Sequence, residues 1–142
     1  MCTVGCYALS SAYSPHLFQH YSELPLWERR DWNSRCGHIA HAVIVVALVA
    51  LTLTRCPGFW GDSVGAGEAP STVLDTVTPL SVATFAFSLG YFATDTVMML
   101  ALHTQPLGMM LGHHLGGAVA LAAVLATGEC HYYGLLLLST EV

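Results

Sequence analysis

The sequence predicts an all-α, multi-pass transmembrane helical bundle with three spans and the start of a fourth. Two observations lead to this prediction. Apolar residues make up 54% of the 142 residues and charged residues only 9%, whereas roughly a quarter of the residues in soluble domains are charged. The apolar residues also gather into long runs that carry almost no charge, as spanning a bilayer requires.

The composition excludes several classes of partner and cofactor. The chain has no lysine and only four arginines, so it offers no basic surface for nucleic acid. Its nine acidic residues are scattered, and the net charge of -5 mostly reflects the missing lysine. The five cysteines are too few and too irregularly spaced for a disulfide scaffold or a CxxC metal site. We therefore expect no nucleic-acid partner and no cofactor.

Residues 1–27 are mixed and mildly polar, and we expect them to be poorly ordered or to lie at the membrane interface. They lack the basic start, apolar stretch and cleavage site of a secretory signal. The first span is predicted at residues 37–54, which contain no charged residue and are rich in Val, Leu and Ala. The composition of residues 55–78 shifts to Pro, Gly, Ser and acidic residues, which is typical of an exposed loop.

The second span is predicted at residues 79–102, with Thr78 as the N-terminal cap and Pro79 at the first helical position. A three-residue connection leads to the third span, residues 106–126, so these two helices should be antiparallel neighbours. The segment "YYGLLLLSTEV" then predicts a fourth span over residues 132–142 that the end of the chain leaves incomplete.

Arginine bias predicts the orientation, because Arg29, Arg30 and Arg35 stand just before the first span and positive residues favour the cytosolic side. The turn at residues 103–105 would then be cytosolic. Cys56 and Cys130 would share the opposite, oxidising side, and whether they pair is left open.

Polar residues within the spans need an explanation, because Asp at a helix centre costs about 2.5–3.5 kcal/mol on the insertion scale. Asp95 and His113 lie nine residues from Thr104 in opposite directions, which places both about 13 Å from the turn, at matching depth. On the first span, His38 and His41 share one helix face. The predicted polar cavity is lined by His41, Ser88, Tyr91, Asp95, His113, His114 and Glu141.

These residues leave several functions open. They could be structural, satisfying one another between helices, or they could line a cavity that binds a lipid without chemistry. They also suit general acid-base catalysis, with His113, His114 and Asp95 as the candidates. Metal binding is the weakest alternative, since an HxxH pair with HH is similar to membrane di-iron ligand sets but supplies too few histidines. We expect no metal.

The third span carries Gly108, Gly112 and Gly116 at four-residue spacing. This small-residue face predicts close helix packing, against a neighbouring span in preference to self-association.

Several segments together resemble the TLC domain, the family that includes ceramide synthases and the translocating-chain-associating membrane proteins. The segment "DWNSRCGHIAHAVIV" is similar to its opening, with Trp32, Arg35 and His41 in matching places. The segments "SLGYFATD", "LGHHLGG" and "STEV" resemble, in order, its Ser-x-Gly-Tyr-Phe-x-x-Asp segment, its paired histidines and the start of a later Glu-containing segment. The resemblance covers residues 28–142, is strongest to the small TLC domain-containing proteins, and implies a longer domain than this apparently truncated chain holds.

The resemblance to ceramide synthases implies that His113, His114 and Asp95 would line an acyl-transfer site. However, the residues after the paired histidines are apolar here, "LGGAVALAAVLATG", where the ceramide-synthase motif is polar and acidic. Our leading interpretation is therefore a membrane protein of the endoplasmic reticulum or plasma membrane that influences or senses membrane lipid composition. A lipid-modifying acyltransferase and a purely structural membrane protein are the alternatives.

Overall fold

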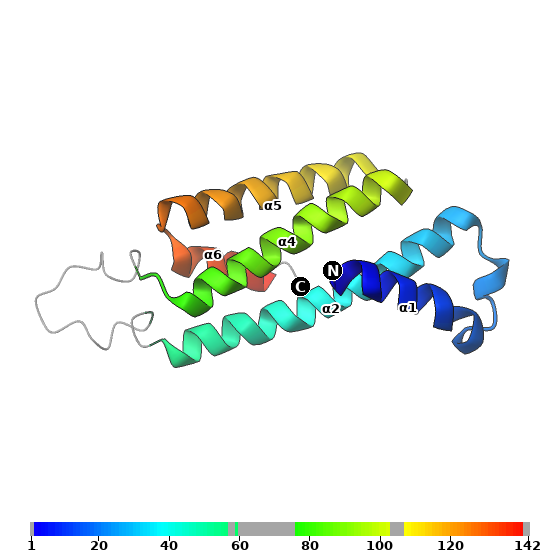
Figure 1. The fold of residues 1–142 in the computed structure, drawn as a ribbon, viewed down its shortest axis with the longest axis horizontal. Coiled ribbons are helices and arrows are strands. Elements are labelled where there is room, and N and C mark those ends of the chain that lie inside the picture. Colours follow the sequence, from blue (N-terminus) through cyan, green and yellow to red (C-terminus); the bar gives the residue numbers. More distant parts are fainter. Residues whose placement is uncertain (1, 57–58, 60–75, 103–106, 141–142) are drawn as a thin grey trace, which may run out of the picture.

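The computed structural model describes residues 2–56, 59, 76–102 and 107–140, and all regular elements within them are helical. The order is α1 (Cys2–Leu17), a short 3-10 turn η1 (Tyr21–Glu23), α2 (Leu26–Arg55), α4 (Pro79–Leu102), α5 (Leu107–Thr127) and α6 (His131–Thr140) (Figure 1). Within this part of the chain, α2, α4 and α5 are long and apolar enough to cross a membrane. The prediction of an all-α transmembrane bundle is confirmed.

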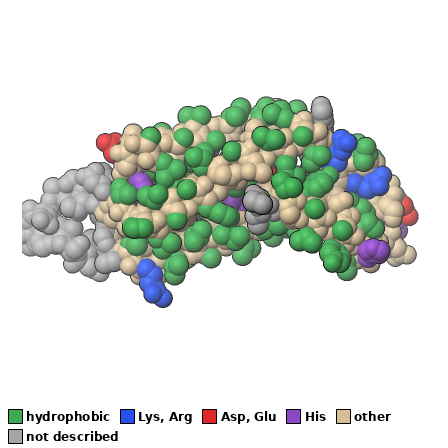
Figure 2. Space-filling view, viewed as in Figure 1, with side chains coloured by type: hydrophobic (Ala, Val, Ile, Leu, Met, Phe, Trp, Pro, Cys, Tyr) green, Lys and Arg blue, Asp and Glu red, His purple; other side chains and the backbone are tan. Residues whose placement is uncertain are grey.

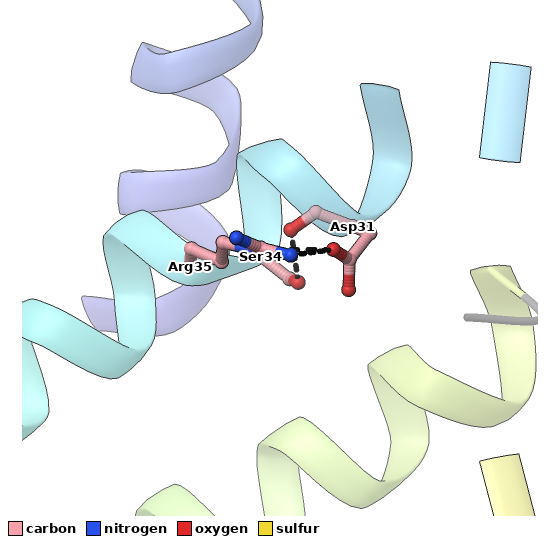
Figure 3. A network of polar contacts seen from close by, with 3 residues as sticks. All are labelled: Asp31, Ser34 and Arg35. Carbon is pink, nitrogen blue, oxygen red and sulfur yellow. Dashed lines mark hydrogen bonds and ion pairs between the residues drawn. The ribbon is translucent and has the colours of Figure 1, made fainter. Parts of the chain in front are cut away.

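Helix α2 begins at Leu26, well before the predicted start of the first span at residue 37. Charged residues end an apolar run in the sequence, but they do not stop the helical hydrogen bonds. Arg35 pairs with Asp31 at 2.6 Å, and the Ser34 hydroxyl donates to the Asp31 carbonyl at 2.8 Å (Figure 3). At 30 residues, α2 is about 45 Å long and exceeds a hydrocarbon core of about 30 Å. Its charged first turns therefore extend beyond the apolar span.

The other boundaries agree closely with the sequence. Helix α4 begins at Pro79 as predicted, and Thr78 caps it: Thr78 Oγ1 accepts from the Ser81 amide at 3.0 Å, and Ser81 Oγ accepts from the Thr78 amide at 3.1 Å. This reciprocal pair satisfies two amides at the helix start. Helix α5 begins one residue later than predicted and ends one residue later, before Gly128, whose φ of 72° lets the chain turn toward α6.

The N-terminal residues form helix α1, which packs along the first half of α2 (Figure 1). Buried Asn33 joins the two helices and η1, because its Oδ1 accepts from Ser10 Oγ at 3.0 Å and from the Tyr21 hydroxyl at 3.1 Å. Trp32 Nε1 donates to Ser14 Oγ at 3.1 Å. This ordered helix differs from the poorly ordered alternative expected for residues 1–27, and an interfacial position for it stays a prediction.

Helix α4 lies between α5 and α2, and α6 packs against α2 near the start of α4. Close contacts pair Asp95 with His114 and Phe92 with Gly117, so α4 and α5 are antiparallel, as predicted. Where α2 begins and α4 ends, Arg30 Nη1 donates to the Leu102 carbonyl at 2.9 Å. This bond places the charged start of α2 beside the end of α4 and satisfies a terminal carbonyl.

The half of the bundle near α6 is a packed apolar core around Phe85, which is fully buried. The His131 ring meets Phe85 edge to face at 5.0 Å between centroids, and a Cβ at Gly134 would stand 2.9 Å from Phe85 Cζ. Ser81 Oγ and His131 Nδ1 lie 2.8 Å apart, at hydrogen-bonding distance. The buried apolar residues of this core are Val45, Val49, Phe59, Phe85, Phe92, Leu121, Leu135 and Leu138.

The outer surface is largely apolar along the helices, and the arginines visible on one face lie toward its two ends (Figure 2). Exposed apolar side chains include Ile39, Val43, Val97, Met109 and Val119. A soluble protein rarely exposes so continuous an apolar surface. In a bilayer these side chains face lipid, which agrees with an integral membrane protein.

The glycine face of α5, at Gly108, Gly112 and Gly116, packs against none of the described residues. A Cβ at Gly108, Gly112 or Gly116 would meet no atom of the described residues within 4 Å, whereas a Cβ at Gly117 would stand 3.2 Å from Phe92 Cζ. Helix α5 turns the His114 and Gly117 side toward α4, so the three-glycine face points elsewhere. Self-association through that face stays a prediction.

Two other expectations concern the ends of the membrane helices. Cys56 and Cys130 are both free thiols, so the disulfide that the sequence left open is not formed. The turn at residues 103–105 lies outside the described residues.

Candidate functional site

A polar layer lies between α2, α4 and α5, with the carboxylate of Asp95 at its centre. Asp95 is only 1% exposed, and its Oδ2 lies 3.3 Å from His38 Nε2 and 3.4 Å from His114 Nδ1. The two imidazoles reach it from different helices, α2 and α5. Side chains of α2, α4 and α5 thus meet at Asp95, and a contribution from the fourth span through Glu141 stays a prediction.

His41 lies one turn beyond His38 on α2 and is held by aromatic rings of α4. Its imidazole stacks on Tyr91, with centroids 3.7 Å apart and planes at 11°, and lies 5.7 Å from Phe87. His41 Nε2 is buried and has no hydrogen-bond partner among the described residues. The same holds for Ser88 Oγ, one helical turn from Tyr91 on α4.

The paired histidines of α5 have different surroundings. His114 is buried beside Asp95, while His113 is exposed and its ring lies 6.1 Å from Phe92 and 5.6 Å from His114. The sequence placed His113 level with Asp95 by its distance from the turn. Depth alone does not decide contact, because consecutive residues point about 100° apart around a helix. Glu141, the remaining predicted site residue, lies outside the described residues.

Two small cavities adjoin this layer, and His41 and Tyr91 line both. The first has a volume of about 140 Å³ and also contacts His38, His113 and His114. The second has a volume of about 260 Å³ and reaches α1 through Thr3. Sequence reasoning missed Thr3, since it carries no charge and no motif marks a helix that packs onto another.

The arrangement suits proton exchange and hydrogen bonding to a neutral polar group. A carboxylate between two imidazoles can hold one proton at alternative positions, and imidazole both donates and accepts. Interactions of this kind are stronger away from water. Within the described ranges, no group of three or more His, Cys, Asp or Glu is arranged to hold a metal ion.

A family model for the TLC domain matches residues 31–142, well over half of the chain. The chain belongs to the TLC-domain family. The match covers Asp95 and all the histidines of the polar layer, and it begins within α2, so helix α1 precedes it. Neither the curated proteins nor the solved structures include a match to this TLC-domain chain.

Proposed function

We propose that this TLC-domain protein influences or senses membrane lipid composition by binding a lipid at the polar layer around Asp95, in the endoplasmic reticulum or plasma membrane. The observation that carries the proposal is the carboxylate of Asp95 within 3.4 Å of two imidazoles and beside two cavities. The proposed lipid-facing residues are those predicted from the sequence, together with His38.

The hydrogen bonding of the layer favours binding over a purely structural role. Buried polar groups that hold helices together normally have hydrogen-bond partners. Here neither Asp95 oxygen has a hydrogen bond of good geometry among the described residues, and His41 Nε2 and Ser88 Oγ have no partner there. A lipid hydroxyl or ester carbonyl entering beside them would supply the missing partners.

Acyl transfer remains the alternative function, and the Asp95–His114 contact is the observation in its favour. A carboxylate beside an imidazole orients it, as general base catalysis on a lipid hydroxyl or amine requires. The apolar residues that follow His114 supply no further acidic group, in contrast to the ceramide-synthase motif that the sequence resembles. Lipid binding without turnover therefore ranks first.

The test compares the lipids of cells that express the wild-type chain with those of cells that express Asp95→Asn at equal abundance and membrane insertion. The asparagine has nearly the same size but no negative charge. Asp31→Asn is the matched control, because Asp31 lies on the charged start of α2 and pairs with Arg35 outside the layer.

We expect a change in acyl composition with the wild type and with Asp31→Asn, and none with Asp95→Asn. The same change in all three would contradict a role for the layer, and no change in any would favour a structural role. Release of a new acylated product by purified wild-type protein would move the assignment to acyltransferase.

A further inference from the structure

The larger cavity beside the polar layer is completed by a helix outside the family match. Its lining comes from three helices: Thr3 of α1, Gly37 and His41 of α2, and Ala86, Phe87, Gly90, Tyr91 and Thr94 of α4. Helix α1 ends at Leu17, before residue 31 where the TLC match begins. The wall formed by Thr3 is therefore a feature of this chain that the TLC match does not cover.

Helix α1 is fixed in place at two points along α2. At the cavity, Thr3 is 6% exposed and rests on Gly37, where a Cβ would stand only 2.8 Å from Thr3 Cγ2. Farther along the hairpin, Asn33 bonds both Ser10 and Tyr21. Because only glycine leaves room for Thr3, the contact at Gly37 sets how closely α1 approaches the cavity.

The cavity has the size and chemistry for one polar group and part of one chain. Its volume of about 260 Å³ lies just below the roughly 300–1,000 Å³ of small-molecule pockets, too small to enclose both chains of a phospholipid. Its lining contains no Lys, Arg, Asp or Glu, so it offers no Lys or Arg side chain to neutralise a phosphate or a carboxylate. His41, which is 8% exposed with Nε2 unpartnered among the described residues, supplies a hydrogen-bonding group instead.

We propose that the cavity completed by α1 binds a neutral single-chain lipid, whose hydroxyl or ester carbonyl hydrogen-bonds to His41. This inference rests on the proposed function in that it names the lipid class for the same polar layer. The stacked ring of Tyr91 fixes the His41 imidazole in one plane, so the bound group is held in a defined direction. Helix α1 contributes Thr3 to the wall of the cavity.

The first test fills the cavity without touching its polar groups. Gly90 lines the cavity, and a Cβ there meets no described atom within 4 Å, so Gly90→Leu places a side chain in open space. Gly108→Leu is the matched control, since Gly108 is also an exposed helical glycine with open space but lines none of the cavities beside the layer. The full chain in nanodiscs is photolabelled with a diazirine monoacylglycerol, and a diazirine fatty acid is the anionic comparison.

We expect the monoacylglycerol to label the wild type and Gly108→Leu equally, and Gly90→Leu about tenfold less, the change that losing roughly 1.4 kcal/mol of binding produces. The fatty acid should label all three weakly. Equal monoacylglycerol labelling of Gly90→Leu and wild type would overturn the proposal, as would stronger labelling by the fatty acid.

The second test moves α1 and then restores it. Gly37→Ala should displace Thr3 and lower monoacylglycerol labelling, and adding Thr3→Ser, which removes Cγ2, should recover most of it. Recovery in the double variant shows that the fold is intact and that the α1 contact matters. Labelling unchanged by Gly37→Ala, or lost equally in the single and double variants, would contradict a role for α1.

These tests separate the two proposals. Labelling is measured on purified protein with the Gly90 and Gly37 variants, which keep Asp95, whereas the proposed function is tested by cellular lipids with Asp95→Asn. Specific labelling with no cellular change would leave the binding site standing and remove the proposed function. A cellular change with no labelling difference between Gly90→Leu and wild type would support the proposed function and overturn the proposed binding site.

Discussion

Asp95 of α4 and His114 of α5 meet inside the bundle, with 3.4 Å between Oδ2 and Nδ1 and less than 5% of either side chain exposed. His38 approaches the same oxygen from α2. One carboxylate thus connects three membrane helices. An isolated charge is costly in a bilayer, so removing one of these contacts to Asp95 should lower the stability of the bundle.

The paired histidines allow a direct comparison of this contact. His114→Leu should lower the free energy of unfolding by about 3 kcal/mol, because it leaves the buried Asp95 charge with one partner fewer. His113→Leu changes an exposed neighbour and should stay within about 0.5 kcal/mol. Denaturation of the full chain in detergent measures both. Equal losses would show that His114 has no special part in holding Asp95.

Gly116 and Gly117 are adjacent on α5, but only Gly117 is packed against another helix. Gly117→Leu should destabilise the α4–α5 pair by about 1–3 kcal/mol, because a Cβ there already stands 3.2 Å from Phe92. Gly116→Leu places the same side chain in open space and should be neutral or slightly stabilising, since leucine favours helix more than glycine. Thermal unfolding of the two variants checks the difference, and a more stable Gly117→Leu would refute the observed packing.

The fold was predictable where the sequence signal is local. The apolar run and the Thr78–Pro79 cap correctly predicted where α4 begins. The short connection after α4 correctly predicted that α5 is its antiparallel neighbour. The apolar run marked the predicted span at residues 37–54, but it carried no signal for the charged turns that start α2 at Leu26. Helix α1 was missed as a packed element because its contacts with Asn33 and Gly37 join residues far apart in the sequence.

The site was predictable in its residue types and depth but not in its contacts. Counting residues from the turn brought Asp95 level with the histidine pair, yet the rotation of α5 decides that His114, and not His113, reaches the carboxylate. His38 joined the layer because it lies one turn from His41 on α2. The spacing of these two histidines was the sequence pattern that could have predicted His38 in the layer. No sequence pattern predicted that Thr3 lines the cavity.

The hairpin of α1 and α2 should depend on Asn33, which is 3% exposed. Asn33→Leu leaves the Tyr21 hydroxyl without its partner and should cost about 1–3 kcal/mol. Adding Tyr21→Phe removes that hydroxyl as well, so the double variant should lose less than the sum of the single ones. Chymotrypsin cleavage after exposed Tyr13 reports on opening of the hairpin. Strict additivity of the two changes would show that the pair is not coupled.

The orientation can be tested with two exposed thiols, Cys36 in the first half of α2 and Cys130 directly before α6. Single-cysteine variants are inserted in sealed vesicles whose cytosolic face points outward. An impermeant maleimide should label Cys36 and leave Cys130 unlabelled until detergent is added, because Arg29, Arg30 and Arg35 favour a cytosolic start for α2. The reverse pattern would invert the topology. Since Asp95 lies nearer the Leu102 end of α4, it would also move the polar layer to the opposite leaflet.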